Sequence, residues 1–337
     1  MRDLLEELER ARARGERVAL ATVVATRRSA PRPIGSKLLV TQGGELHGSV
    51  SGGCVESDVY ESCQAVLRGA SPELLSYGIS DDQAFEVGLP CGGEIDVFVE
   101  EPDPELLSRL AEIVRAEQHA VVFTDLATGA KRLVVQGDDA DADELIRGGR
   151  SKVLEADGSA RFADVYGPPP RVFVYGAVDT AEALCRAAKT IGWRTVVADA
   201  RAKFATRERL PSADEVLVAW PEEALATVAP DHATAVVVLT HDDKFDLPAL
   251  RGALETDAFY VGALGSRRNQ ERRRERLLEA GVPEEALERI HGPAGLDLGA
   301  ATPAETALSM LAEIVATRFG RTGGPLRESQ HRIHAEV

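Results

Sequence analysis

The chain has 337 residues, of which 44% are hydrophobic and 28% charged, and its formal net charge at pH 7 is −16. This length and composition are typical of a globular protein with two domains, each large enough to bury its own core. The acidic balance disfavours nucleic acid and anionic membrane surfaces as partners, and the lack of an apolar run of roughly 20 residues or of a signal peptide predicts a cytoplasmic protein.

The first elements in the chain predict a small mixed domain. Residues 3–14 have the spacing of a short amphipathic helix, and residues 18–26 are a run of apolar and β-branched residues typical of a buried strand. A loop with two prolines follows, and residues 37–41 and 45–50 then predict two strands joined by a glycine turn. Basic side chains gather around the proline loop, where they could receive a small anionic ligand. They are Arg27, Arg28, Arg32 and Lys37.

The second of these strands leads into residues 48–56, GSVSGGCVE, which we call the signature loop. Apolar residues recur at helical spacing after it and predict a helix with Cys54 in its first turn. Because amides at a helix start are unpaired, and because Gly52 and Gly53 allow close approach, we predict an anion site here that includes Ser51. The helix dipole would also ease ionisation of the thiol. The residues alone leave open whether this thiol is a nucleophile or a soft ligand.

The other cysteines carry different predictions. Cys63 lies on the apolar stripe of the same helix, so its expected role is packing. Cys91 and Gly92 belong to another paired-glycine stretch, and Cys91 either lines the same pocket as Cys54 or belongs only to a tight turn. The four cysteines include no C-x-x-C pair and no regular spacing, which argues against a zinc cage and a disulfide framework.

The remainder of the first half predicts more strands and ends at a proline-rich linker. Further strands are expected at residues 74–79, 95–99, 119–124 and 131–135, a helix at 104–117, and a polar acidic stretch at 137–144. The linker Gly167-Pro168-Pro169-Pro170 is stiff and rich in turn residues. We therefore predict an N-terminal α+β domain at residues 1–166, a second domain at 167–320 and a flexible tail at 321–337.

After the linker, apolar strands alternate with helices. This is the pattern of an α/β domain with a doubly wound parallel sheet of the Rossmann type. The expected strands are residues 172–175, 194–199, 215–219, 235–239 and 259–262. A final helix is predicted to begin after Thr302, with Pro303 at its first position and Glu305 placed to complete a capping box.

A dinucleotide site in this domain would need G-x-G-x-x-G after the first strand and an acid about 20 residues later. Asp199 supplies the acid, but Val178 stands where a pyrophosphate needs bare backbone. Asp179 would cap the helix with its own carboxylate and would repel a phosphate. NAD(P) binding at the turn after Gly176 is therefore disfavoured, although the fold prediction does not depend on it.

Two later stretches also follow strand ends and would border the ligand crevice of the sheet. Gly265 and Ser266 at a helix start, with Arg267 beside them, form a better anion cradle than the Gly176 turn. His241 is either a general acid or base or a hydrogen-bond partner that stabilises its turn. It forms no recognisable catalytic motif with a Ser or Cys, so no catalytic residue is assigned.

Together these motifs resemble the XdhC/CoxI family of xanthine dehydrogenase accessory proteins. The resemblance covers residues 15–318 in the family's order, and its most specific part is the signature loop. The other matching motifs are the Pro-Arg-Pro loop, Cys91-Gly92-Gly93, Asp199-Ala200-Arg201, Thr240-His241-Asp242, residues 262–268, Gly295-Leu296-Asp297 and Thr302-Pro303-Ala304-Glu305. The chain departs from the family where Val178 and Asp179 replace the usual glycine and histidine.

The resemblance implies a protein that binds the molybdenum cofactor (molybdopterin), protects it, assists its sulfuration by a cysteine desulfurase and delivers it to a molybdenum hydroxylase. By position, Cys54 is the residue expected to contact the cofactor and its metal. A soft sulfur beside an anion site suits a ligand that holds its metal through sulfur and carries a phosphate. We expect a homodimer without turnover of its own. The alternatives are an NAD(P)-dependent oxidoreductase that uses the crevice with His241, and a plain interaction scaffold.

Overall fold

The chain folds into two units, which are described separately. The computed structural model describes residues 4–28, 30–78, 93–156 and 159–329. The first unit comprises Met1–Pro168 with Leu326–Val337, and the second comprises Pro169–Pro325.

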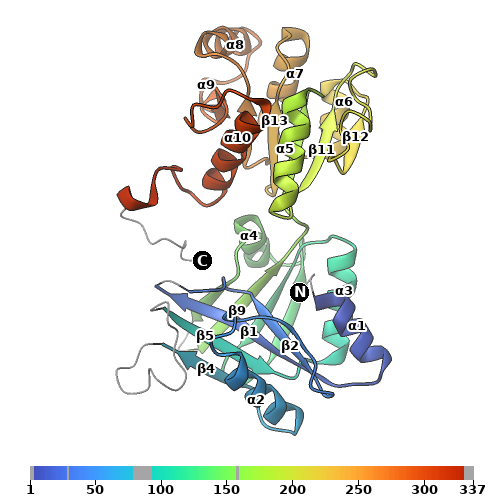
Figure 1. The fold of residues 1–337 in the computed structure, drawn as a ribbon, viewed down its shortest axis with the longest axis vertical. Helices are drawn as coiled ribbons and strands as arrows, with labels where there is room; N and C mark the ends of the chain where they lie inside the picture. Colours follow the sequence, from blue (N-terminus) through green and yellow to red (C-terminus); the bar gives the residue numbers. More distant parts are fainter. Residues whose placement is uncertain (1–3, 29, 79–92, 157–158, 330–337) are drawn as a thin grey trace. The chain divides into compact units, whose positions relative to one another are not determined.

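The first unit contains helices packed on two antiparallel sheets (Figure 1). Its helices are α1 (Leu5–Ala13), α2 (Glu56–Leu67), α3 (Pro104–Arg115) and α4 (Ala140–Gly148), with a short 3-10 helix at Leu326–Glu328. Its strands are β1 (Val18–Arg27), β2 (Lys37–Thr41), β3 (Leu46–Gly48), β4 (Glu73–Tyr77), β5 (Glu94–Glu100), β6 (Ala120–Asp125), β7 (Lys131–Val135), β8 (Lys152–Ala156) and β9 (Ser159–Tyr166). The strand orders are β3-β2-β1-β5-β4 and β7-β6-β9-β8.

Strand β1 is the centre of this unit because it is buried on both faces. Alternate residues such as Ala21 and Val23 pack with Cys63 under α2, as a strand period of two requires. The residues between them point the other way, and Val24 packs with Phe162 of the second sheet. This arrangement explains why the strand reads as a continuous apolar run, and it confirms the packing role predicted for Cys63.

A polar cluster is buried where the two sheets face each other. The Nζ atom of Lys37 lies 2.6 Å from a carboxylate oxygen of Asp164, and both side chains are at least nine-tenths buried. The same carboxylate accepts hydrogen bonds from the hydroxyls of Ser151 and Tyr166. A second pair, Lys131 with Glu100 at 2.8 Å, lines the same small cavity. Burial of these charges is less costly because each is paired with an opposite charge.

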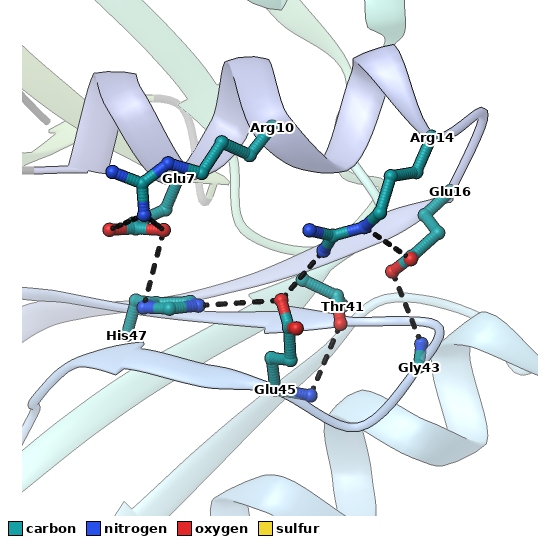
Figure 2. Close-up of polar contacts among 8 residues, drawn as sticks. All are labelled: Glu7, Arg10, Arg14, Glu16, Thr41, Gly43, Glu45 and His47. Carbon is teal, nitrogen blue, oxygen red and sulfur yellow. Dashed lines mark hydrogen bonds and ion pairs between the residues drawn. The ribbon is translucent and has the colours of Figure 1, made fainter.

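The β2–β3 hairpin is tied to α1 by a network of charged side chains (Figure 2). Arg14 bridges Glu16 at 2.7 Å and Glu45 at 2.6 Å, which joins the end of the helix to the hairpin turn. The ring of His47 lies between Glu7 and Glu45, with ring nitrogens 3.7 and 3.8 Å from their carboxylate oxygens. The strand that leads into the signature loop is therefore fixed from outside the sheet as well as within it.

Residues 137–166 contain structure that the sequence did not predict. Helix α4 occupies part of the stretch predicted only as polar and acidic, and β8 and β9 were not predicted. Asp139 caps α4 by accepting hydrogen bonds from two backbone amides, and Leu145 and Ile146 bury its inner face. An N-cap aspartate followed by apolar residues at helical spacing was the available signal.

The second unit is a parallel sheet covered by helices on both faces (Figure 1). Its strands are β10 (Arg171–Tyr175), β11 (Arg194–Ala198), β12 (Glu215–Leu217), β13 (Thr234–Val238), β14 (Tyr260–Ala263) and β15 (Ile290–His291). Its helices are α5 (Asp179–Thr190), α6 (Pro221–Val228), α7 (Asp243–Leu254), α8 (Arg267–Glu279), α9 (Glu284–Leu287) and α10 (Pro303–Arg318). The order β12-β11-β10-β13-β14-β15 is that of a Rossmann fold, so the predicted fold class is confirmed.

The two faces of the sheet have separate cores. Val172 and Val174 of β10 pack with residues of α5 and α10, whereas Phe173 and Tyr175 pack with residues of α6, α7 and α8. The capping box of α10 is present as predicted, because the Thr302 hydroxyl accepts from the Glu305 amide and the Glu305 carboxylate accepts from the Thr302 amide. The edge strand β15 was not predicted. Over the described part of the chain, no helix combines the length and apolarity needed to cross a membrane.

Candidate functional site

The signature loop wraps around the carboxylate of Glu56, the first residue of α2. One oxygen accepts from the hydroxyl of Ser49 at 2.6 Å and from the amides of Ser51 at 2.8 Å and Gly52 at 3.0 Å. The other oxygen accepts from the amide of Gly53 at 2.8 Å and from the hydroxyl of Ser51. The backbone amides predicted to bind an external anion are therefore paired with a carboxylate of the chain itself.

These hydrogen bonds also change the pKa of the Glu56 carboxyl group. Partial burial opposes ionisation of Glu56, but the hydroxyls of Ser49 and Ser51 and the amides of Ser51 and Gly53 outweigh it and lower the pKa of Glu56 to about 2. The prediction that these amides are free to bind an anion is wrong, and so is the predicted helix start. Helix α2 begins at Glu56 rather than at Cys54, because the residues before Glu56 bend around its side chain.

Cys54 lies on this fixed loop with its thiol exposed. Its amide and that of Val55 both donate to the hydroxyl of Ser51 at 2.9 Å, and Val55 is buried. By contrast, Cys63 and Cys185 are buried, and burial raises the pKa of each to about 12. Among the described residues, the signature loop therefore presents the one solvent-accessible thiol, on a backbone held by hydrogen bonds.

Two further predictions concern what surrounds this thiol. Cys91 and Gly92 lie outside the described residues, so the prediction of a pocket shared with Cys54 stays a prediction. In the described ranges, no three His, Cys, Asp or Glu side chains converge as a metal site.

Most cations of the basic cluster near the proline loop are paired with carboxylates of the chain itself. Three of its four members have carboxylate partners: Arg27 pairs with Asp96 at 3.2 Å, Arg28 lies 3.9 Å from Glu94, and Lys37 pairs with Asp164 at 2.6 Å. Arg32 is exposed, and no residue in the described part of the chain forms an ion pair or hydrogen bond with it. The predicted cluster of four cations thus offers one free guanidinium.

A cavity of about 560 Å³ lies between this arginine and the signature loop. Arg32, Ile34 and Ser36 from the proline loop line one part of it, and Gly48 and Ser49 from the signature loop line another. None of the described residues that line it carries a carboxylate. In a chain of net charge −16, such a cavity is a suitable environment for an anionic group.

In the second unit, the turn after β10 is closed by its own carboxylate. Asp199 is 1% exposed and accepts from the amide of Ala177 at 2.9 Å and from two guanidinium nitrogens of Arg201 at 2.7 and 2.9 Å. Burial opposes ionisation of Asp199, but Arg201 and the Ala177 amide outweigh it and lower its pKa. The acid that would bind a ribose hydroxyl in a dinucleotide site is therefore satisfied within the protein.

The start of α5 differs in one respect from the sequence prediction. Asp179 does not cap the helix, because the N-cap residue is Val178, which makes no side-chain capping bond. The Asp179 carboxylate is exposed and lies 3.5 Å from Arg209. An acidic, partly paired group at this position still disfavours a phosphate at the helix start.

The later strand ends carry the other predicted site residues. His241 is exposed after β13 and has no hydrogen-bond partner among the described residues, so the alternative that it stabilises its turn is not what the structure contains. Ser266 caps α8 by accepting from the Asn269 amide at 3.3 Å, and Arg267 beside it is exposed. Because β13 and β14 are adjacent and parallel, both stretches lie at the carboxyl edge of the sheet.

A buried ion pair holds that edge together. Arg273 of α8 bonds to Asp246 of α7 at 2.6 Å, and both side chains are more than nine-tenths buried. Asp246 also accepts from the hydroxyl of Thr240, and Arg273 donates to Gln270 at 2.7 Å. These contacts fix the backbone that carries the exposed residues of the edge.

Sequence reasoning missed the two residues that organise these sites. Glu56 was placed in the signature loop without a role, yet its three-residue spacing from Gly53 matches the reach of a capping-box glutamate to a backbone amide. Glu313 was also missed. It accepts from the Tyr260 hydroxyl at 2.6 Å and the Gly295 amide at 2.8 Å, and it faces His291, so it holds the glycine-rich loop after β15. No local pattern pointed to Glu313, which lies far along the chain from its partners.

Comparison with known proteins identifies relatives for both units. The sequence model described as the XdhC and CoxI family matches residues 11–78, and the one described as the XdhC Rossmann domain matches residues 172–314. A protein from Bacillus subtilis that is named as a probable xanthine dehydrogenase component is 30% identical over 90% of this chain and 94% of the relative. The molybdenum cofactor insertion chaperone PaoD from Escherichia coli is 30% identical over 90% of this chain and 85% of the relative.

A solved structure agrees with these relatives. A crystal structure described as a xanthine dehydrogenase from Bacillus halodurans superposes with a TM-score of 0.69 at 26% sequence identity, covering 97% of this chain and 98% of that one. The similarity therefore extends through both units and over nearly the full length of the relatives. On this basis the chain belongs to the XdhC and CoxI family.

Proposed function

We propose that this protein is an accessory protein of molybdenum cofactor maturation. It binds the cofactor, protects it, assists its sulfuration by a cysteine desulfurase and delivers it to a molybdenum hydroxylase of the xanthine or carbon monoxide dehydrogenase type. Family membership supports the general role, since one relative is named as a molybdenum cofactor insertion chaperone. The protein acts as a cytoplasmic homodimer without turnover of its own.

The observation that carries the proposal is the exposed thiol of Cys54 on a backbone that is already fixed. The loop is held by Glu56 and by the hydroxyl of Ser51, so little ordering is required when a ligand binds. A thiol is a soft donor, and the bound cofactor would supply a metal held by sulfur. The donor set therefore fits a cofactor that brings most of its own metal ligands.

The residues of the second unit have supporting roles in this proposal. Gly265, Ser266, Arg267 and His241 lie at the carboxyl edge of the sheet and contribute exposed polar groups for a ligand or a partner. Asp199 only positions the Gly176 turn and Arg201, because its carboxylate is occupied by Arg201 and the Ala177 amide.

The test is retention of molybdenum by the purified full chain. Wild-type protein expressed in cells that make the cofactor should retain molybdenum after gel filtration, and Cys54→Ser should retain at least tenfold less, because the oxygen is a poor match for a soft metal. The control is Ser57→Ala, a neighbouring exposed position on α2. Equal retention by wild type and Cys54→Ser would remove Cys54 from the site, and no retention by wild type would overturn the function.

Nucleotide titration of the same preparation tests the alternative that the protein is an NAD(P)-dependent oxidoreductase. Titration with NAD(H) and NADP(H), followed by intrinsic fluorescence, should show no saturable binding up to about millimolar concentration, because Asp199 is buried and Val178 occupies the turn. Saturable binding would revive the NAD(P)-dependent oxidoreductase with His241. Copurification of a hydroxylase with neither ligand bound would favour the scaffold.

A further inference from the structure

We propose that the cavity between the proline loop and the signature loop binds the phosphate group of the cofactor, with Arg32 as the residue that holds it. This inference rests on the proposed function for its choice of ligand. It concerns a cavity lined by Gly48 and Ser49 of the signature loop, and not the amides of residues 51–53, where the sequence pattern had placed the anion.

The backbone amides that would form the predicted anion site are already occupied. The amides of Ser51, Gly52 and Gly53 donate to the carboxylate of Glu56, which is ionised at neutral pH. A phosphate at this position would have to displace that carboxylate or lie beside it. Either arrangement is unfavourable, because like charges repel and because the amides have no further protons to offer.

Of the four cations near the proline loop, Arg32 is the one without a carboxylate partner among the described residues. Arg27 and Arg28 face the carboxylates of β5, and Lys37 is buried against Asp164. Arg32 carries an exposed guanidinium without a partner in the described residues, and its planar donors match the geometry of a phosphate.

The size and the lining of the cavity suit a phosphate group. At about 560 Å³ it falls in the range of small-molecule sites. Ser36 adds a hydroxyl that has no partner in the described part of the chain, and Leu4 and Ile34 add apolar surface. Of the described residues that line the cavity, none is acidic, so none of them opposes an anion.

Ser49 connects this cavity to the loop that carries the thiol. Ser49 lines the cavity, and its hydroxyl also donates to Glu56 and accepts from the Gly52 amide at 2.7 Å. The wall of the cavity and the residues just before Cys54 are thus bonded to the same carboxylate. A ligand with a phosphate at one end and a sulfur-bound metal at the other could engage both without rearranging the loop.

The first experiment uses inorganic phosphate as the probe. Equilibrium dialysis of the cofactor-free full chain with radiolabelled phosphate should show saturable binding, and Arg32→Gln should weaken it about tenfold to hundredfold, as expected for loss of a charge-assisted bond. Arg28→Gln is the matched control, because it removes a cation of the same loop that does not line the cavity. Absent binding to wild type, or equal binding to wild type and Arg32→Gln, would overturn the inference.

The second experiment asks whether the site serves the cofactor. Added phosphate should accelerate release of cofactor from wild type and from Arg28→Gln, whereas Arg32→Gln should release it faster at the outset and with little response to phosphate. If cofactor release is the same in all three proteins and insensitive to phosphate, the cavity holds free phosphate only and the assignment to the cofactor is wrong. A wild type that retains no cofactor overturns the proposed function instead, and the dialysis still decides whether Arg32 binds phosphate.

Discussion

The signature loop and the Gly176 turn are both glycine-containing connections from a strand to a helix, and in both a carboxylate of the chain occupies backbone amides. In the signature loop the carboxylate belongs to Glu56, which follows the amides by three to five residues in the sequence. The thiol of Cys54 is exposed in the same loop. In the turn the carboxylate is Asp199 from a neighbouring strand, and it is buried with Arg201.

The two connections differ in the side chains that they expose to solvent. The signature loop is held locally, so its outer surface stays free to present Cys54. The turn is held by a longer-range contact that joins β10 to the end of β11, and it exposes no reactive group. In both regions a carboxylate of the chain accepts from backbone amide groups, and of the two only the signature loop presents an exposed thiol.

The largest expected effect tests the structural role of the turn. Asp199→Ala leaves the buried Ala177 amide without an acceptor and Arg201 without its partner, so we expect it to lower the free energy of unfolding by about 2–4 kcal/mol. Urea denaturation followed by circular dichroism would measure this. The exposed Asp257→Ala is the control and should change stability by less than about 0.5 kcal/mol. Similar stability in the two variants would mean that Asp199 is kept for a ligand.

A smaller effect is expected at the signature loop. Glu56→Gln places an amide group among donors, which removes about half of the carboxylate's favourable contacts, and we expect a loss of about 2 kcal/mol. Amide hydrogen exchange at Gly52 and Gly53 should become faster. Glu61→Gln, on the exposed side of the same helix, should leave both measurements unchanged. Unaltered exchange in Glu56→Gln would show that the loop is held by something other than this carboxylate.

The smallest effect is the acid dependence of the same contact. The pKa of Glu56 is depressed in the folded chain, from an ordinary value of 4.5 to about 2, so its stabilisation is fully present above pH 4.5 and is lost as the pH falls towards 2. Because the group is partly exposed, we expect a contribution of about 1 kcal/mol after solvent screening. The stability difference between wild type and Glu56→Gln should shrink across this interval, and a constant difference would contradict the assigned pKa.

Much of the fold could be predicted because its signals are periodic and local. The continuous apolar runs predicted the central strands of the Rossmann sheet, and Thr302 with Glu305 predicted the start of α10. Strands β8 and β9 could not be recognised in the same way, since β8 is short and β9 is only half buried, and each depends on a partner strand: β9 pairs with β6, and β8 pairs with β9.

The candidate site could be predicted only as far as its signals are local in the sequence. The composition of the signature loop drew attention to Cys54, and the structure exposes this cysteine, while its role as a ligand stays a prediction. The composition could not reveal that Glu56 turns back onto the amides, because this depends on the path of the loop. It also could not tell Arg32 from its three basic neighbours, because their partners come from β5 and from residue 164, far along the chain.

The buried pair between Lys37 and Asp164 has a consequence for where this protein can be divided. Lys37 lies in the segment matched to the XdhC and CoxI family, residues 11–78, whereas Asp164 lies between that segment and the matched Rossmann domain at residues 172–314. A chain shortened to the first matched segment would leave one ammonium group without its counter-charge and one face of β1 without its cover. The limits of a family match are thus not limits of independent folding, and residues 93–166 belong to the smallest piece that can carry the signature loop.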